Sequence, residues 1–197
     1  MEVFKKDKKL WRKIQKGDEK SFAELYDLYV EKLYKFVFLK INNQAKAEEI
    51  VQDIFLKLWK LGQDEAKREV RNVLALLYKM ARFAVIDYYR STNAAKAKEI
   101  VSIDELAASQ ELEITVDIVH EEEMDQEYAL EEVKRALAEL PEIYKDVVIM
   151  RFMDEMDYKE IAEVIGKEEG NVRVLVHRAL KKLREILNSK KDESAAD

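Results

Sequence analysis

The sequence predicts an all-α protein made of two small helical domains that are joined by an acidic, mostly irregular linker. Of the 197 residues, 48% are hydrophobic and 39% are charged, which provides enough apolar side chain for a core. Only four residues are glycine and one is proline, so the chain has little material for the turns of a sheet protein. Apolar residues recur every three or four positions over long stretches, which is the period of an amphipathic helix. These observations together predict the fold class.

The charge is divided unevenly along the chain. The formal net charge is −6, yet residues 1–98 carry 22 basic and 14 acidic side chains, whereas residues 99–133 carry 13 acidic side chains and no lysine or arginine. Because this acidic block separates two less acidic segments, we expect it to be a spacer between two modules. The predicted organisation is a first domain over residues 1–92, an acidic linker over 93–125, a second domain over 126–190 and a disordered tail over 191–197.

Hydrophobic periodicity predicts four helices in the first domain, each bounded by a cap or a breaker residue. The first surrounds Trp11 and ends at Gly17, and Asp18 is the expected N-cap of the second. The run INNQA is expected to end the second helix near Ile41. Four amphipathic helices with short connections indicate a compact bundle. The third and fourth helices are predicted over residues 45–61 and 66–90.

The fourth predicted helix combines basic and aromatic side chains. Cations that follow phosphates, beside aromatic faces on which bases stack, are typical of sites that hold single-stranded nucleic acid. Aromatic residues at helical spacing also fill cores, so this pattern alone leaves both interpretations open. The basic members are Arg68, Arg71, Lys79, Arg82 and Arg90, and the aromatic members are Tyr78, Phe83, Tyr88 and Tyr89.

The clearest motif is the segment DYKEIAEVIGKEEGNVRVLVHRALKKLR at residues 157–184. Asp157 followed by Glu160 is typical of a capping box, and Gly166 stands where a helix would end. The helix expected after the turn has a basic polar side, with no acidic residue from Asn171 to Arg184. This pattern predicts a helix-turn-helix, whose second helix enters the DNA major groove. A surface helical hairpin with a solvated basic side is the structural alternative.

Two further helices are expected before this motif. Helix formation resumes near Gln126. Pro141 is expected at the first position of the next helix, PEIYKDVVIMRFM, where its missing N–H costs nothing. The polar tail after Leu187 is expected to fray.

Composition argues against several other classes of protein. The chain has no cysteine, which excludes disulfides and thiolate metal sites and fits a reducing cytosol. We find neither the apolar run of a signal peptide nor the ~20 apolar residues of a membrane span. We therefore expect a cytoplasmic protein with no membrane contact of its own.

The sequence also argues against an enzyme. It has no glycine-rich phosphate loop, and its only imidazoles are those of His120 and His177. His120 lies in the run HEEE, and an acidic run of this kind is far more often solvated than metal-binding. We expect no catalytic residue, no metal and no cofactor.

Two sets of stretches resemble the second and fourth conserved regions of bacterial RNA polymerase sigma factors of the small extracytoplasmic-function (ECF) type. The first set is AEEIVQDIFLKLWK with LLYKMARFAVIDYYR, and the second is LPEIYKDVVIMRF with DYKEIAEVIG and GNVRVLVHRALKKLREIL. The resemblance covers most of residues 18–90 and 126–187. It implies a factor that binds core RNA polymerase, recognises promoter DNA and helps to open it, while the polymerase performs the catalysis. Whether an anti-sigma factor inhibits it stays open.

The resemblance also implies three sets of contact residues. The set expected to bind core polymerase is Glu48, Glu49, Gln52, Asp53 and Phe55. The set expected at the −10 element, where a flipped base would enter a pocket, is Arg82, Phe83, Asp87 and Arg90. The set expected at the −35 element, where arginines contact phosphates and base edges, is Arg151, Asn171, Arg173, Val174, His177 and Arg178.

Several residues depart from the pattern of this family. Phe83 stands where the family usually has Asn, and Leu76 where it usually has Trp. Glu168 replaces the usual Ser or Thr cap, and a longer carboxylate side chain caps less well. Val174 and Leu175 replace a polar or basic pair, which weakens direct readout of bases. The promoter sequence therefore cannot be inferred from the family. The main alternative function is a free-standing helix-turn-helix regulator that binds duplex DNA by itself.

Overall fold

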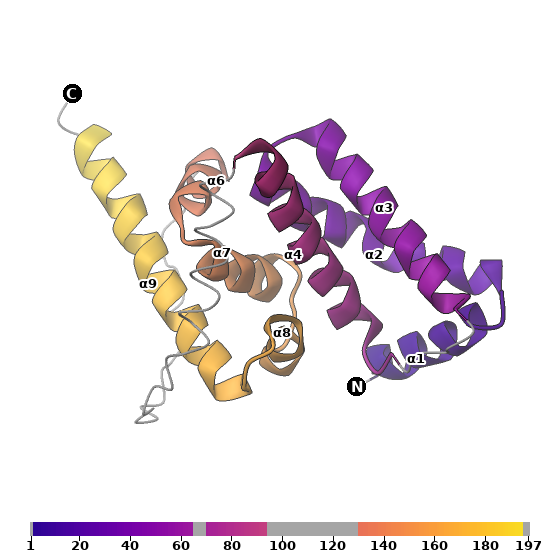
Figure 1. Cartoon of the computed structure of the whole chain (residues 1–197). Coiled ribbons are helices and arrows are strands. Elements are labelled where there is room, and N and C mark those ends of the chain that lie inside the picture. The colour runs from indigo at the N-terminus through magenta and orange to yellow at the C-terminus, as the bar shows by residue number, and fades with distance from the viewer. Residues whose placement is uncertain (1, 65–69, 94–129, 195–197) are drawn as a thin grey trace. The chain divides into compact units, whose positions relative to one another are not determined.

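The computed structural model describes residues 2–64, 70–93 and 130–194, and every regular element within these ranges is a helix (Figure 1). The chain divides into two compact units, Met1–Tyr89 and Arg90–Asp197. The predicted all-α fold with two helical domains is therefore confirmed. The predicted linker over residues 93–125 lies, apart from its first residue, outside the described ranges.

The described residues of the first unit form four helices, and two of the predicted boundaries are confirmed in atomic detail. The Asp18 carboxylate accepts hydrogen bonds from the backbone N–H groups of Lys20 and Ser21 at 3.1 and 3.4 Å. The hydrogen bond from the Ser21 hydroxyl, at 2.9 Å, is the main cause of a lowered Asp18 pKa. Asn42 adopts a left-handed conformation (φ 48°) that ends the second helix. The helices are α1 (Glu2–Ile14), α2 (Glu19–Ile41), α3 (Gln44–Gly62) and α4 (Val73–Thr92).

The start of α4 differs from the expectation. A helix was predicted from residue 66, whereas residues 70–72 are not helical and α4 begins at Val73. The side chain of Asn72 accepts a hydrogen bond from the Ala75 backbone N–H at 3.0 Å. An asparagine that caps in this way satisfies an otherwise unpaired helix N–H. The cap therefore determines the start of α4, although Val70 continues the apolar period.

In the first unit, aromatic contacts and hydrogen bonds from tyrosine hydroxyls hold the helices together. The rings of Phe36 and Tyr78 meet edge to face, with centroids 5.1 Å apart, in the core between α2 and α4. The Tyr89 hydroxyl donates to the Lys40 backbone carbonyl at 2.6 Å, which joins the end of α4 to the end of α2. The buried Tyr29 hydroxyl donates to the Asp7 carboxylate and joins α2 to α1. These hydrogen bonds satisfy buried polar groups and fix the register of the helices.

The second unit contains the predicted helix-turn-helix. The Asp157 carboxylate accepts from the Glu160 backbone N–H, and the Glu160 carboxylate accepts from the Asp157 N–H, both at 2.7 Å. This is the predicted capping box. Gly166 has a φ of 70° and ends the first helix of the motif, as expected. The described elements are α6 (Leu130–Glu139), α7 (Glu142–Val148), the π-helix η1 (Ile149–Met153), α8 (Tyr158–Ile165) and α9 (Glu169–Ser194).

Three features of the second unit differ from the expectation. Pro141 is the N-cap of α7, and its carbonyl accepts from the Lys145 N–H at 3.0 Å, so it precedes the first helical residue. The helix expected to include residues 149–153 changes there to a π-helix. Helix α9 runs through residues 188–194, where a frayed tail was expected. In the described part of the chain, no helix has the length and hydrophobicity needed to cross a membrane.

Substitution of Gly62 is expected to destabilise the first unit. A Cβ atom at this position would lie 2.8 Å from Cγ2 of the fully buried Ile14. Alanine is usually better than glycine inside a helix by about 0.5–1 kcal/mol, but overpacking a core costs about 1–3 kcal/mol. We therefore expect Gly62→Ala to lower the free energy of unfolding by about 1–2 kcal/mol in urea denaturation.

The combination of Gly62→Ala with Ile14→Ala is the control, because it removes the methyl group that the new Cβ would meet. Its destabilisation should be smaller than the two single effects added together. A Gly62→Ala protein at least as stable as the wild type would show that helix propensity outweighs this contact.

Candidate polymerase and nucleic-acid interfaces

The structure brings four of the five residues predicted to bind core polymerase onto the exposed side of α3. Glu48, Glu49, Gln52 and Asp53 all have exposed side chains. Gln44 donates to Glu48 at 3.0 Å, and Lys46 forms an ion pair with Glu49 at 2.7 Å. We refer to Glu48, Glu49, Gln52 and Asp53 as the α3 acidic surface. It offers carboxylates and an amide to a basic partner.

Phe55 differs from the other four because it is buried, with only 3% of its surface exposed. Its ring packs against the rings of Tyr26 and Phe22, with centroid distances of 4.7 and 6.3 Å. Phe55 therefore supports the surface from beneath. It also forms part of the floor of an apolar groove between α2 and α3.

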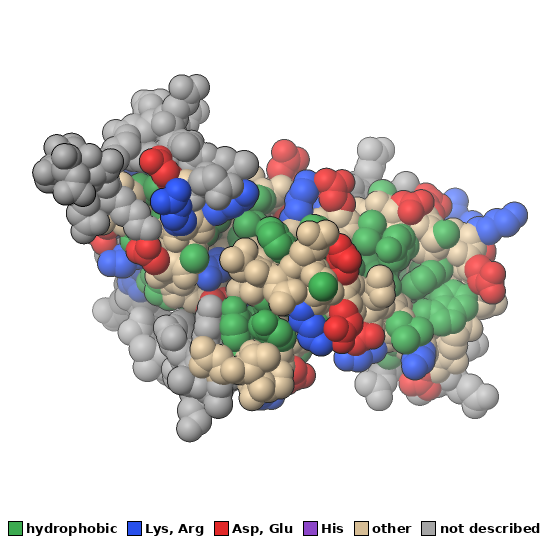
Figure 2. Space-filling view, turned by 90° about the horizontal axis from the view of Figure 1, so that it is seen from above, with side chains coloured by type: hydrophobic (Ala, Val, Ile, Leu, Met, Phe, Trp, Pro, Cys, Tyr) green, Lys and Arg blue, Asp and Glu red, His purple; other side chains and the backbone are tan. Residues whose placement is uncertain are grey.

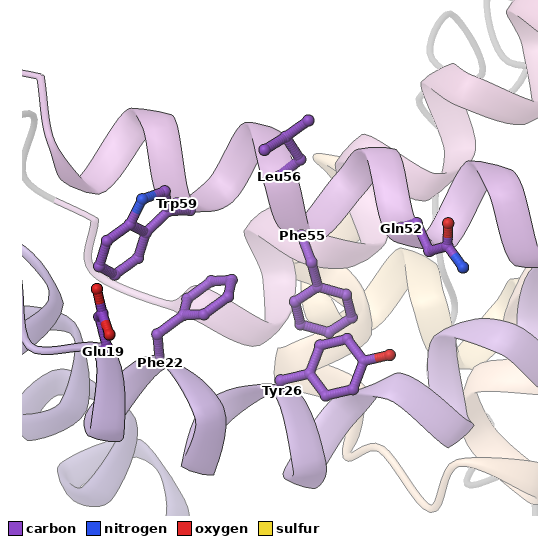
Figure 3. Close-up of a pocket in the computed structure, with 7 residues that line it drawn as sticks. All are labelled: Glu19, Phe22, Tyr26, Gln52, Phe55, Leu56 and Trp59. Atoms are coloured by element: carbon purple, nitrogen blue, oxygen red, sulfur yellow. The ribbon is translucent and has the colours of Figure 1, made fainter.

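This α2–α3 groove was not identified from the sequence. Its volume is about 490 Å³, and it borders the α3 acidic surface at Gln52 (Figure 3). Leu56 is half-exposed beside it, and the Trp59 ring meets that of Phe22 at 5.0 Å. A signal was present in the sequence, because apolar side chains recur at spacings of three and four on both helices. The lining residues are Glu19, Phe22, Tyr26, Gln52, Phe55, Leu56 and Trp59.

Three of the four residues predicted at the −10 element are exposed on one side of α4. Phe83, Asp87 and Arg90 follow each other at spacings of four and three and are all exposed, whereas Arg82 is half-buried. Lys79, one turn earlier, is also exposed on this side. Phe83 is 66% exposed, the largest value among the exposed large hydrophobic side chains that the structure describes. An aromatic ring in water beside cations is suited to stacking on a base.

The other aromatic residues of α4 do not form a stacking surface. Tyr78 is completely buried, and Tyr89 is 8% exposed with its hydroxyl bound to the Lys40 carbonyl. The sequence leaves a stacking role and a core role open for these two tyrosines, and the structure places both in the core of the bundle. Tyr88 is half-buried. Arg68 lies outside the described residues.

Helix α9 has one buried and one basic side. Val172, Val176 and Ala179 are at most 1% exposed. Arg173 and His177 are exposed at a spacing of four, and Lys181 continues this row one turn later. Among the other predicted −35 residues, Asn171, Val174 and Arg178 are half-buried along the edges of the exposed side.

On the described face of Figure 2, basic and acidic side chains are interspersed with hydrophobic ones, so no single charge sign dominates that view.

Arg151 and Arg173 meet on the ring of Tyr158. The Arg151 guanidinium carbon lies 4.8 Å from the ring centroid, and that of Arg173 lies 4.3 Å from it. Arg151 also donates to the Met156 carbonyl at 3.3 Å, and Arg173 forms an ion pair with Glu169 at 2.6 Å. Cations are attracted to the electron-rich face of an aromatic ring. No signal in the sequence predicts this arrangement, since contacts among three elements leave no local pattern.

The described residues contain no group of three or more histidine, aspartate or glutamate side chains that could hold a metal ion. His120, which was weighed as a metal ligand, lies outside the described part.

Two family models match the chain, one on each unit. The model described as Sigma-70 region 2 matches residues 25–95, and the model described as Sigma-70, region 4 matches residues 130–183. Together they match more than half of the chain. The first contains α3 and α4, and the second contains the helix-turn-helix.

Curated relatives agree with these matches. The chain is 26% identical over 187 residues to the ECF RNA polymerase sigma factor SigW of Bacillus subtilis (strain 168), which covers 91% of this chain and 96% of the relative. It is 25% identical over 170 residues to the ECF RNA polymerase sigma factor SigM of the same strain, with 85% and 96% covered.

Two solved structures share the fold. CnrH, in a complex with the cytosolic domain of CnrY, aligns with a TM-score of 0.64 at 20% identity, over 93% of this chain and 98% of that chain. The sigma factor RpoE from Bartonella quintana, in a complex with the anti-sigma factor NepR, aligns with a TM-score of 0.55 at 23% identity, over 86% and 98%.

Both sigma-70 regions are present in the family order, each on the unit that carries the corresponding helices, and the relatives match along nearly their whole length. The chain therefore belongs to the ECF group of the sigma-70 family of RNA polymerase sigma factors.

Proposed function

We propose that the two units divide the work of promoter recognition and opening between them. The observation that carries this proposal is the amphipathic build of α9, which buries valines and alanine on one side and exposes Arg173 and His177 on the other within a helix-turn-helix. In this proposal the first domain, residues 1–92, binds core polymerase and the −10 element. The second domain, residues 126–190, binds the −35 element, and residues 93–125 connect the two.

The α3 acidic surface is the proposed docking site for core polymerase. Three carboxylates and one amide on the exposed side of one helix favour a partner with basic residues. The α2–α3 groove beside them offers apolar area at Leu56 and Trp59, and Phe55 holds the groove open from below. Charged groups of this kind direct the orientation of binding, and buried apolar contacts provide most of the affinity.

The exposed row on α4 is the proposed site for the separated −10 strand. Lys79 and Arg90 are placed to follow phosphates, while Phe83 between them presents a ring to an unstacked base. Phe83 has no hydrogen-bonding group, so it cannot read a base edge as the usual asparagine can. We infer that this position holds a base by stacking, which tolerates different bases.

The remaining parts of the function follow from the family. Catalysis belongs to the polymerase, so we infer that the chain is an initiation factor with no active site and no cofactor of its own, working in the cytoplasm. The solved structures of CnrH and RpoE contain the cytosolic domain of CnrY and the anti-sigma factor NepR. We infer that an anti-sigma factor also regulates this chain.

Substitution of Arg178 tests the recognition helix. Arg178→Ala should cost about 1–3 kcal/mol of affinity for −35 duplex if the guanidinium reads a base, or lower the salt slope by about one if it contacts only phosphate. The measurement is a salt titration of holoenzyme binding. Lys182→Ala is the matched control, because it removes the same charge one turn further along and Lys182 is paired with Glu185 at 3.3 Å. Unchanged affinity and slope for Arg178→Ala would place α9 away from DNA.

Substitution of Phe83 tests the stacking role. Phe83→Ala should weaken holoenzyme binding to a forked −10 probe by about 1–3 kcal/mol, the contribution of one base stacked on an aromatic ring. Phe83→Trp keeps an aromatic ring at this position and should bind the probe as tightly as the wild type. Leu28→Ala on α2 controls for the loss of an exposed apolar side chain, since Leu28 is 39% exposed. Equal effects of Phe83→Ala and Leu28→Ala would contradict the stacking role.

The dependence on core polymerase tests the proposal as a whole. The isolated chain should bind duplex promoter weakly, and core should raise its affinity because polymerase holds both domains at the spacing of the two elements. Asp53→Lys should weaken this gain by placing a cation on the α3 acidic surface. Glu31→Lys makes the same charge change on α2 and should leave the gain intact. Gel shifts at fixed salt, with and without core, measure both effects.

Tight, sequence-specific binding of the isolated chain that core does not alter would instead support the free-standing regulator.

A further inference from the structure

The cluster formed by Arg151, Tyr158, Glu169 and Arg173 joins two cations and one anion around a single ring. Its members come from η1, α8 and α9, so the cluster exists only when the helix-turn-helix is folded. Both guanidinium groups lie over the Tyr158 ring, at 4.8 and 4.3 Å from its centroid. Two like charges so placed favour a nearby anion. In the protein alone this anion is the Glu169 carboxylate, 2.6 Å from Arg173.

The Glu169–Arg173 ion pair is weak, so another anion can replace the Glu169 carboxylate beside Arg173. Both side chains are about half-exposed, 48% for Glu169 and 59% for Arg173, so water and salt weaken the attraction between them. Glu169 is the first residue of α9, on the helix that we propose to enter the major groove. A carboxylate at that place is repelled by DNA phosphates, whereas the guanidinium beside it is attracted. The two partners of the pair therefore respond to DNA in opposite directions.

We propose that Glu169 is an internal counter-anion that a DNA backbone phosphate replaces, and that Tyr158 is a positioning residue that holds Arg173 during this exchange. This inference rests on the proposed contact between α9 and the −35 element. When the phosphate arrives, Arg173 releases Glu169 and stays over the Tyr158 ring, so it needs no search through its rotamers. The Glu169–Arg173 ion pair lowers the affinity for DNA of any sequence, because a phosphate that binds Arg173 must first displace the Glu169 carboxylate.

The effect of the exchange is measurable with Glu169→Gln in the full-length chain bound to core polymerase. This variant should bind −35 duplex about two- to fivefold more tightly at low salt, since Arg173 no longer has a competing carboxylate. The gain should shrink as salt increases, because ions screen the removed charge. Glu168→Gln is the matched control. It removes one charge from the neighbouring residue without releasing Arg173, so its gain should be smaller and independent of Arg173.

A double-mutant cycle isolates the exchange from general charge effects. The gain of Glu169→Gln should disappear in an Arg173→Ala background. Tyr158→Phe keeps the ring and should preserve both the affinity and the gain. Tyr158→Leu should reduce both, and thermal unfolding of the two Tyr158 variants checks that any loss comes from a folded protein.

Three results would overturn the inference. A loss of affinity in Glu169→Gln would show that the carboxylate orients Arg173 for readout and does not compete with phosphate. An unchanged affinity, or a gain that survives Arg173→Ala, would show that the ion pair plays no part in binding. Arg178→Ala separates these outcomes from failure of the proposed function. If Arg178→Ala weakens binding while Glu169→Gln gives one of these contrary results, only the exchange is wrong. If no α9 variant changes binding, the −35 contact itself is wrong.

Discussion

Burial of one side of α9 is the constraint on which the second unit depends. Val172 and Ala179 are completely buried, and Val176 is 1% exposed, so the helix cannot rotate about its axis without exposing them. Each of the two valines contributes about 1.5–3 kcal/mol when buried, whereas an exposed ion pair on a helix contributes about 0.3–0.5 kcal/mol. Hydrophobic packing therefore decides which side chains face solvent. Arg173 and His177 face solvent as a consequence of what the opposite side buries, and we propose that they contact DNA there.

In the first unit, core packing likewise determines that Phe83 faces solvent. Tyr78 and Tyr89 are held in the core, one by the Phe36 ring and the other by a hydrogen bond to the Lys40 carbonyl. With these two positions inward, helical geometry turns Phe83 outward, although a phenylalanine would otherwise favour burial. Such an exposed ring reduces solubility and contributes nothing to the core. We propose that Phe83, between Lys79 and Arg90, serves in binding instead.

Local signals in the sequence were sufficient for much of the fold, and non-local contacts account for the rest. Several helix ends lie where the sequence predicts them, because capping depends on residues within four positions of each other. These ends are marked by Asp18, by the Asp157–Glu160 pair and by Gly166. The start of α4 was misplaced because the apolar period continues through Val70, while the Asn72 cap begins the helix later. For the candidate sites, exposure could not be inferred from spacing alone, which is why the sequence leaves both a stacking and a core role open for Tyr89. The contact of Tyr158 with two arginines involves three elements and has no counterpart in a linear pattern.

The acidity of the chain fits a factor that works only in a complex. A net charge of −6 gives the free protein little general attraction to DNA, and non-specific affinity is dominated by phosphate contacts. The basic side chains that we propose to contact DNA lie on two separate units, one row on α4 and one on α9. Neither row alone provides the many contacts of a tight duplex binder. Joint engagement raises the effective concentration of the second contact once the first is made, provided that the spacing is fixed. A polymerase docked on the α3 acidic surface would supply that spacing, and a low intrinsic affinity would then restrict promoter binding to the assembled enzyme.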